Sequence, residues 1–126
     1  MDRFSGQLRE GMKALWNCHG VCLMTAMTHS LESDLHNRAQ HFRLLLDCAG
    51  ACAFAADMLA HKTQFHTQVC TLCADMCDTC AQDCEQLGNL NDCVVACRDA
   101  AARSRDLAKL HHAEVVGMAS RLPPEP

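Results

Sequence analysis

Five cysteines lie within fifteen residues in the stretch CTLCADMCDTCAQDC, which spans residues 70–84. They follow one another at intervals of three, four, three and four residues, at Cys70, Cys73, Cys77, Cys80 and Cys84. Residues at these intervals lie on one face of an α-helix. The stretch therefore predicts a helix with a stripe of sulfur about 21 Å long. A thiolate can ligate soft metal ions, attack as a nucleophile or exchange disulfides, so the spacing must decide among these chemistries.

The spacing Cys-x-x-x-Cys recurs in three other segments. Cysteine can pack as a small hydrophobic residue, and this interpretation suits any single pair. Valine, alanine or leucine would fill the same space without reactivity, however, so eleven cysteines at core-facing positions of a 126-residue chain favour a chemical role. The three further pairs are Cys18/Cys22, Cys48/Cys52 and Cys93/Cys97.

Several roles for these thiols compete. Thiols four residues apart on one straight helix have nearly parallel Cα–Cβ bonds and cannot close a disulfide without unwinding, although bridges between helices stay open. A structural zinc site needs four converging ligands, usually supplied by loops, whereas one helix presents its sulfurs in a row. Iron–sulfur ligation meets the same objection, and the usual spacings are absent.

Cu(I) fits a stripe of thiols better than these alternatives. Thiolate selects Cu(I) strongly, two or three sulfurs are enough to hold the ion, and one thiolate can bridge two ions. Eleven thiolates would hold about five ions without sharing and roughly twice that number with full bridging. The sequence therefore predicts that multiple Cu(I) ions bind along the core.

Two histidines are predicted to join the cysteines as ligands. His29 lies seven residues after Cys22, and His41 lies seven residues before Cys48, so both share the helix face of the thiols. Both fall at the end of the predicted fold where Cys93 lies, and we expect copper to enter there.

The opposite end is predicted to be closed by leucines. His66 and His111 are also assigned to core-facing positions, and Met24 and Met27 flank the thiols of the first helix. Whether these four side chains bind metal stays open. The leucines expected to close the end are Leu8, Leu15, Leu59 and Leu107.

The elements that position these residues are predicted to be four long helices. Alanine, leucine and methionine favour helices, and the three prolines all occur in the last four positions. Short connections make neighbouring helices antiparallel, so the fold class is all-α, an up-down-up-down four-helix bundle. Residues 1–126 form a single domain with a short proline-rich tail at 122–126. The expected helices span 4–29, 34–61 with Ser33 as N-cap, 64–87 with Gly88 as the stop, and 91–121.

Composition and charge argue against several function classes. The formal charge is −4 and basic residues do not cluster, so no nucleic-acid binding is expected. No apolar run approaches the roughly 20 residues of a membrane span, and the start MDRFSGQLREGMK lacks an export signal, so we expect a cytoplasmic protein without membrane association. Thiols stay reduced in that compartment. No Glu-x-x-His motif or phosphate-binding glycine loop occurs, so no enzyme activity is expected.

Three stretches of the chain resemble the cytosolic copper storage proteins, which are four-helix bundles lined by cysteine. They are HFRLLLDCAGAC, QVCTLCADMCDTCAQDC and DCVVAC, within residues 41–97. The resemblance implies Cu(I) storage or sequestration and commonly a homotetramer. Ala100, Ser104 and Leu107 stand where heavily loaded members continue with cysteine, so we expect a reduced capacity.

The leading interpretation is therefore a Cu(I)-binding bundle for storage, sequestration or buffering. Its predicted partners are copper ions, a copper donor or acceptor protein, and further copies of the chain that meet through the outer stripe Leu44, Ala51 and Met58. Its predicted metal ligands are Cys18, Cys22, Cys48, Cys52, Cys70, Cys73, Cys77, Cys80, Cys84, Cys93, Cys97, His29 and His41.

Two other functions compete with this interpretation. A thiol redox protein would need an accessible thiol of low pKa, and Arg98 beside Cys97 is the one candidate to lower such a pKa. A structural helical bundle with incidental metal binding is the third interpretation.

Overall fold

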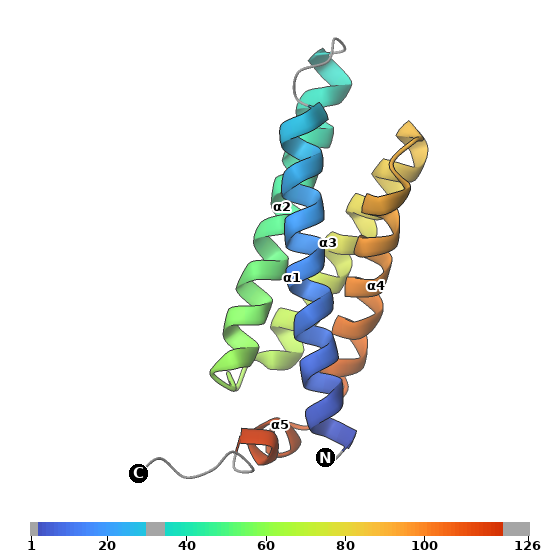
Figure 1. The fold of residues 1–126 in the computed structure, drawn as a ribbon. Helices are drawn as coiled ribbons and strands as arrows, with labels where there is room; N and C mark the ends of the chain where they lie inside the picture. The colour runs from blue at the N-terminus through green and yellow to red at the C-terminus, as the bar shows by residue number, and fades with distance from the viewer. Residues whose placement is uncertain (1–2, 30–34, 120–126) are drawn as a thin grey trace.

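The computed structural model describes residues 3–29 and 35–119, and side chains within residues 6–28 and 39–116. The long helices of the described residues lie side by side, and a short helix lies across one end of them (Figure 1). The helices are α1 (Arg3–His29), α2 (Leu35–Ala60), α3 (His66–Leu87), α4 (Asn91–Ala108) and α5 (His112–Ala119).

The four long helices form an antiparallel ring. α1 packs against α2, α2 against α3, α3 against α4, and α4 against α1 (Figure 1). The connections at residues 61–65 and 88–90 are short, as expected for antiparallel neighbours. The predicted all-α, up-down-up-down bundle is confirmed. Because alternate helices run in opposite directions, the starts of α1 and α3 share one end of the bundle with the ends of α2 and α4.

Most helix boundaries agree with the sequence prediction. α1 begins one residue earlier than expected and ends at His29 as expected. The predicted N-cap Ser33 lies outside the described residues, as does the tail at 122–126. α3 begins two residues later than expected, because the Thr63 hydroxyl accepts a hydrogen bond from the Phe65 amide at 3.1 Å and holds these residues in a turn.

Gly88 ends α3 as predicted. Its φ of 79° lies in the left-handed region that favours glycine, and its amide donates to the Cys84 carbonyl at 3.1 Å. This turn lets α4 start within a few residues and places Cys84 beside the first thiol of α4, Cys93.

The prediction of one helix over 91–121 was wrong. α4 ends at Ala108, where the amides of Lys109 and Leu110 bond to carbonyls three residues back and tighten the last turn. Side chains from the start of α3 hold this turn: the Thr67 hydroxyl donates to the Ala108 carbonyl at 3.0 Å, and His66 Nε2 donates to the Leu110 carbonyl at 2.6 Å. These tertiary hydrogen bonds override the helical pattern of the local sequence.

A new helix, α5, starts after this turn. The Glu114 carboxylate accepts a hydrogen bond from the His111 amide at 3.0 Å, which is half of a capping box. α5 then lies against α1, with Val115 only 1% exposed, and covers the end of the bundle where the chain begins (Figure 1). We call this the closed end, and the end with Cys84 and Cys93 the thiol end.

The closed end is tightly packed by the predicted leucines. Leu15, Leu59 and Leu107 are at most 2% exposed and Leu8 is 9% exposed, so their predicted burial is confirmed. Gly11 allows α1 to approach α4 here, because a Cβ at this position would lie 2.5 Å from the Leu107 Cδ1 atom. An alanine could not occupy this position without displacing Leu107.

Candidate metal centre

All eleven cysteines face the interior of the bundle. Each is at most 1% exposed, and each is a free thiol. The predicted core phase of every cysteine is therefore confirmed. Their sulfurs are 3.3 Å apart or more where they approach, well beyond the roughly 2.05 Å of a disulfide bond.

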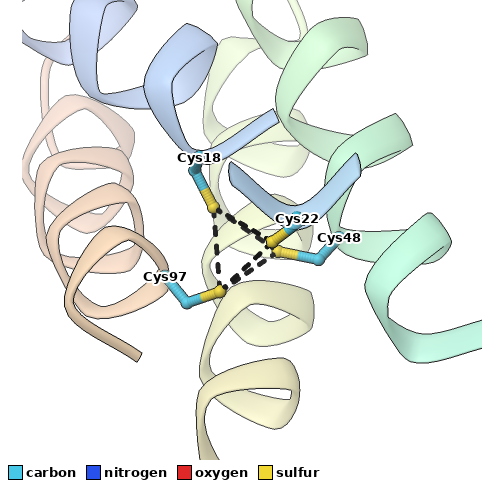
Figure 2. Close-up of side chains that lie close together, drawn as sticks. All are labelled: Cys18, Cys22, Cys48 and Cys97. Atoms are coloured by element: carbon cyan, nitrogen blue, oxygen red, sulfur yellow. Dashed lines mark hydrogen bonds between the residues drawn. The ribbon is translucent and has the colours of Figure 1, made fainter. Parts of the chain in front are cut away.

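One set of four sulfurs occupies the middle of the bundle (Figure 2). α1 supplies Cys18 and Cys22, α2 supplies Cys48, and α4 supplies Cys97, with all four sulfurs within 4.8 Å of one another. The Cys18 and Cys48 sulfurs are 3.6 Å apart, and the Cys22 and Cys97 sulfurs are 3.5 Å apart. Thiols from three helices thus converge on one point.

Two further sets share sulfurs with this one. Toward the closed end, Cys52 and Cys77 join Cys18 and Cys48, with Cys48 and Cys52 lying 3.5 and 3.4 Å from Cys77. Toward the thiol end, Cys80 and Cys93 join Cys22 and Cys97. Because each outer set shares two sulfurs with the middle set, the three sets form one continuous network.

Two more cysteines extend this network at its ends. Cys84 lies 3.3 Å from Cys93 at the thiol end. Cys73 lies 4.0 Å from both Cys52 and Cys77 at the other side. Among the described residues, Cys70 belongs to no set of three or more potential ligands.

The sulfur spacing suits direct coordination. With metal–sulfur bonds near 2.3 Å, as for zinc, three sulfurs about 4 Å apart can all reach one ion at their centre. Four sulfurs at these distances could also surround a tetrahedral ion. The sequence argument against zinc was therefore wrong on geometry, because it considered one helix and the bundle combines three. What favours Cu(I) is the sharing of sulfurs between neighbouring sets, since thiolates readily bridge Cu(I) ions.

Protons on these sulfurs must leave when metal binds. Hydrogen bonds with Cys18 and its neighbours lower the pKa of Cys77, whereas those with Cys18 and Cys22 raise the pKa of Cys48. Burial alone raises the pKa of Cys70 to about 11. Since a metal binds the thiolate, each ion that enters displaces protons from the network.

His41 is buried between α2 and α3 and is held by a carboxylate. It is 4% exposed, and its Nδ1 lies 2.6 Å from Asp83 Oδ2. With Nδ1 donating to Asp83, Nε2 is the nitrogen that can coordinate a metal, and such a carboxylate partner is typical of metal-binding histidines. Sequence reasoning missed Asp83, because nothing in the spacing places it opposite His41. His41 belongs to no set of three ligands among the described residues, so its role stays a prediction.

The other candidate ligands from the sequence do not all lie in the core. The His29 side chain lies outside the described residues. Met24 and Met27 are 72% and 54% exposed, and Met24 lines a cavity of about 570 Å³ whose wall includes Cys93. His111 is exposed, so its assignment to the core was wrong, since the helix that would have turned it inward ends before it.

Arg98 does not activate Cys97. Its guanidinium donates to Asp78 at 2.9 Å and to Glu85 at 3.1 Å on the outside of the bundle. Hydrogen bonds with Cys18 and Cys22 raise the pKa of Cys97. The proposed basis for an acidic, reactive thiol at this position was therefore wrong.

No described helix is long and apolar enough to cross a membrane.

Comparison with known proteins extends these findings. The family model described as copper storage protein matches residues 5–109. The uncharacterized cysteine-rich protein YhjQ of Bacillus subtilis (strain 168) is 33% identical over 73 residues, which is 58% of this chain and about three-fifths (61%) of that protein's length.

Two solved structures share the fold. The Nmul_A1745 protein of Nitrosospira multiformis is 36% identical with a TM-score of 0.76, covering 82% of this chain and 95% of that one. The Cu(I)-bound copper storage protein BsCsp3 is 27% identical with a TM-score of 0.75, covering 81% of this chain and 98% of that one. The match over residues 5–109 includes every cysteine of the network, and it confirms the resemblance seen in the sequence. This chain belongs to the copper storage protein family.

Proposed function

We propose that this protein holds several Cu(I) ions inside its bundle, for storage, sequestration or buffering of copper in the cytoplasm, and that it catalyses no reaction. The observation that carries the proposal is the continuous sulfur network. Cys18 and Cys48 belong to two sets of potential ligands, and so do Cys22 and Cys97. A protein that bound a single structural ion would need only one such set.

The burial of the thiols argues for holding ions rather than for redox catalysis. A redox thiol must reach its substrate, whereas every cysteine here is at most 1% exposed. A bare ion can pass where a protein or peptide disulfide cannot. Transfer of copper to and from the bundle is then the task of a donor or acceptor protein that meets the thiol end.

Association into a homo-oligomer is also part of the proposal. A groove of about 330 Å³ between α2 and α3 is lined by Ala51, Leu72 and other mostly apolar residues. Phe54 and Leu72, which both line this groove, are 54% and 59% exposed. Contact with another copy would bury these side chains, in keeping with the predicted role of the Leu44, Ala51 and Met58 stripe.

Anaerobic titration of the reduced protein with Cu(I), in competition with a strong chelator, tests the proposal. We expect several equivalents to bind, each with thiolate-to-copper absorption. A parallel titration with Zn(II) serves as the control for metal identity. Binding of one equivalent of copper or fewer, or stronger retention of Zn(II) than of Cu(I), would contradict Cu(I) storage.

A further inference from the structure

The closed end contains buried polar atoms in addition to its packed leucines. Within the described part of the chain, two of them have no hydrogen-bond partner: Gln7 Oε1 and His66 Nδ1. Gln7 is near the start of α1 and His66 starts α3, so both lie toward the same end of the bundle. A buried polar atom without a partner is unfavourable, and a bound ion is one way to satisfy it.

The ring of His66 is oriented with one lone pair directed into the protein. His66 is 3% exposed, and its Nε2 lies 2.6 Å from the Leu110 carbonyl oxygen. A carbonyl can only accept, so Nε2 carries the hydrogen and Nδ1 of the neutral ring carries the lone pair. A backbone carbonyl that accepts from the second ring nitrogen is the usual partner of a metal-binding histidine. The ring also stacks on His112 of α5, with centroids 6.1 Å apart.

Cys70 is the nearest thiol along the same helix face. It follows His66 by four residues, one helical turn, and is fully buried. Among the described residues it stands outside the three sulfur sets. The spacing i, i+4 is the one by which a single helix supplies two ligands to one metal ion.

We propose that His66 Nδ1 and Cys70 Sγ form a separate Cu(I) site at the closed end, apart from the shared sulfur network. Cu(I) accepts two ligands, and a thiolate with an imidazole suits it. This inference rests on the proposed function, since copper must first enter the bundle. With α5 and the buried leucines covering this end, the ion held here would be the last to be released.

Four proteins test the site: wild type, His66→Gln, Cys70→Ser and the double variant. Glutamine can place an amide donor near the position of Nε2 and so keep the hydrogen bond to Leu110, but it offers no ring nitrogen. The exposed His61, changed to Gln, is the matched control. Circular dichroism and thermal unfolding of each apo protein establish that the variants fold.

The first readout is the number of Cu(I) ions held against a chelator. Each single variant should hold one ion fewer than wild type, and the double variant should also hold only one fewer, because both residues serve the same ion. His61→Gln should match wild type. The second readout is the ¹⁵N resonance of the His66 ring in wild type, which needs no variant to fold. On loading, Nδ1 should move from the lone-pair position to a metal-bound one while Nε2 stays protonated.

Three results would overturn the site. One is an unchanged copper count in His66→Gln with an unmoved Nδ1 resonance, which would make His66 a packing residue. Another is a loss of two ions in the double variant, which would place the residues in separate sites. Failure of wild type to bind copper at all would overturn the proposed function too, whereas the first two results leave it intact.

Discussion

Cys48 and Cys84 offer a direct comparison of a shared and a terminal sulfur. Both are fully buried, so changing either to alanine removes the same atom from the same kind of environment. The Cys48 sulfur lies 3.6 Å from Cys18, 3.5 Å from Cys77 and 3.7 Å from Cys97, and it belongs to two sets. Cys84 belongs to none of the sets; its sulfur lies 3.3 Å from Cys93, and it also interacts with the Cys80 thiol.

The magnitudes follow from this difference. In the apo protein each variant should lose about 1 kcal/mol of unfolding free energy, from about 0.8 kcal/mol of lost burial and a small cavity. In the loaded protein a tenfold loss of affinity for one ion costs about 1.4 kcal/mol. If Cys48 ligates two ions and Cys84 one, the additional losses are about 2.8 and about 1.4 kcal/mol respectively.

Anaerobic denaturant unfolding with and without Cu(I) measures both quantities. The apo measurement removes the packing contribution, so the copper-dependent part reports ligation alone. Equal copper-dependent losses in Cys48→Ala and Cys84→Ala would refute the conclusion that Cys48 is shared between ions. A larger loss in Cys84→Ala would place the main copper cluster at the thiol end.

Four further predictions follow. The reduced, metal-free protein should already be helical by far-UV circular dichroism, because leucine, alanine and neutral thiols fill the core; a random-coil spectrum would mean that metal folds the chain. His41→Ala should change the rate of copper loading or removal more than the number of ions held. Cys77→Ala should change the number of ions held more than the rate. If His41→Ala loads and unloads copper at the wild-type rate, the copper entrance lies elsewhere. Gly20→Ala should stabilise α1 by up to about 1 kcal/mol, because alanine favours a helix more than glycine does. In Gly11→Ala the same gain should be lost to an overpacking cost of about 1–3 kcal/mol. Equal thermal stabilities of the two variants would contradict the close approach of α1 and α4. Burial raises the pKa of Cys70 from 9.0 to about 11, so the contribution of this thiol to apo stability is present below pH 9 and is lost as the pH rises toward 11. Over that range Cys70→Ala should lose less stability than wild type, by roughly 2–3 kcal/mol. An identical pH dependence in wild type and Cys70→Ala would contradict the shift.

The features that follow from helical periodicity could be predicted from the sequence. The three- and four-residue spacing of the thiols fixes their common face, and every cysteine is buried as expected. Gly88 ends α3 because a left-handed residue is needed there, which glycine supplies at little cost. The common face of the thiols and the end of α3 both depend on interactions between residues close together in the sequence.

The features that depend on contacts between helices could not be predicted. The end of α4 at Ala108 requires donors from Thr67 and His66, and the local sequence after it gives no sign of them. The pairing of His41 with Asp83 joins residues 42 positions apart. Convergence of thiols from three helices likewise needs the bundle itself, which is why the geometric argument against a tetrahedral site was wrong.

The number of copper ions per chain is the most direct test of a shared sulfur network. Eleven thiolates that each served one ion, two to an ion, would hold about five. Native mass spectrometry of the anaerobically loaded wild-type protein should therefore show more than about five Cu(I) ions per chain. Saturation at about five ions or fewer would contradict the sharing of sulfurs between ions, and saturation with a single ion would also contradict the network as a copper store.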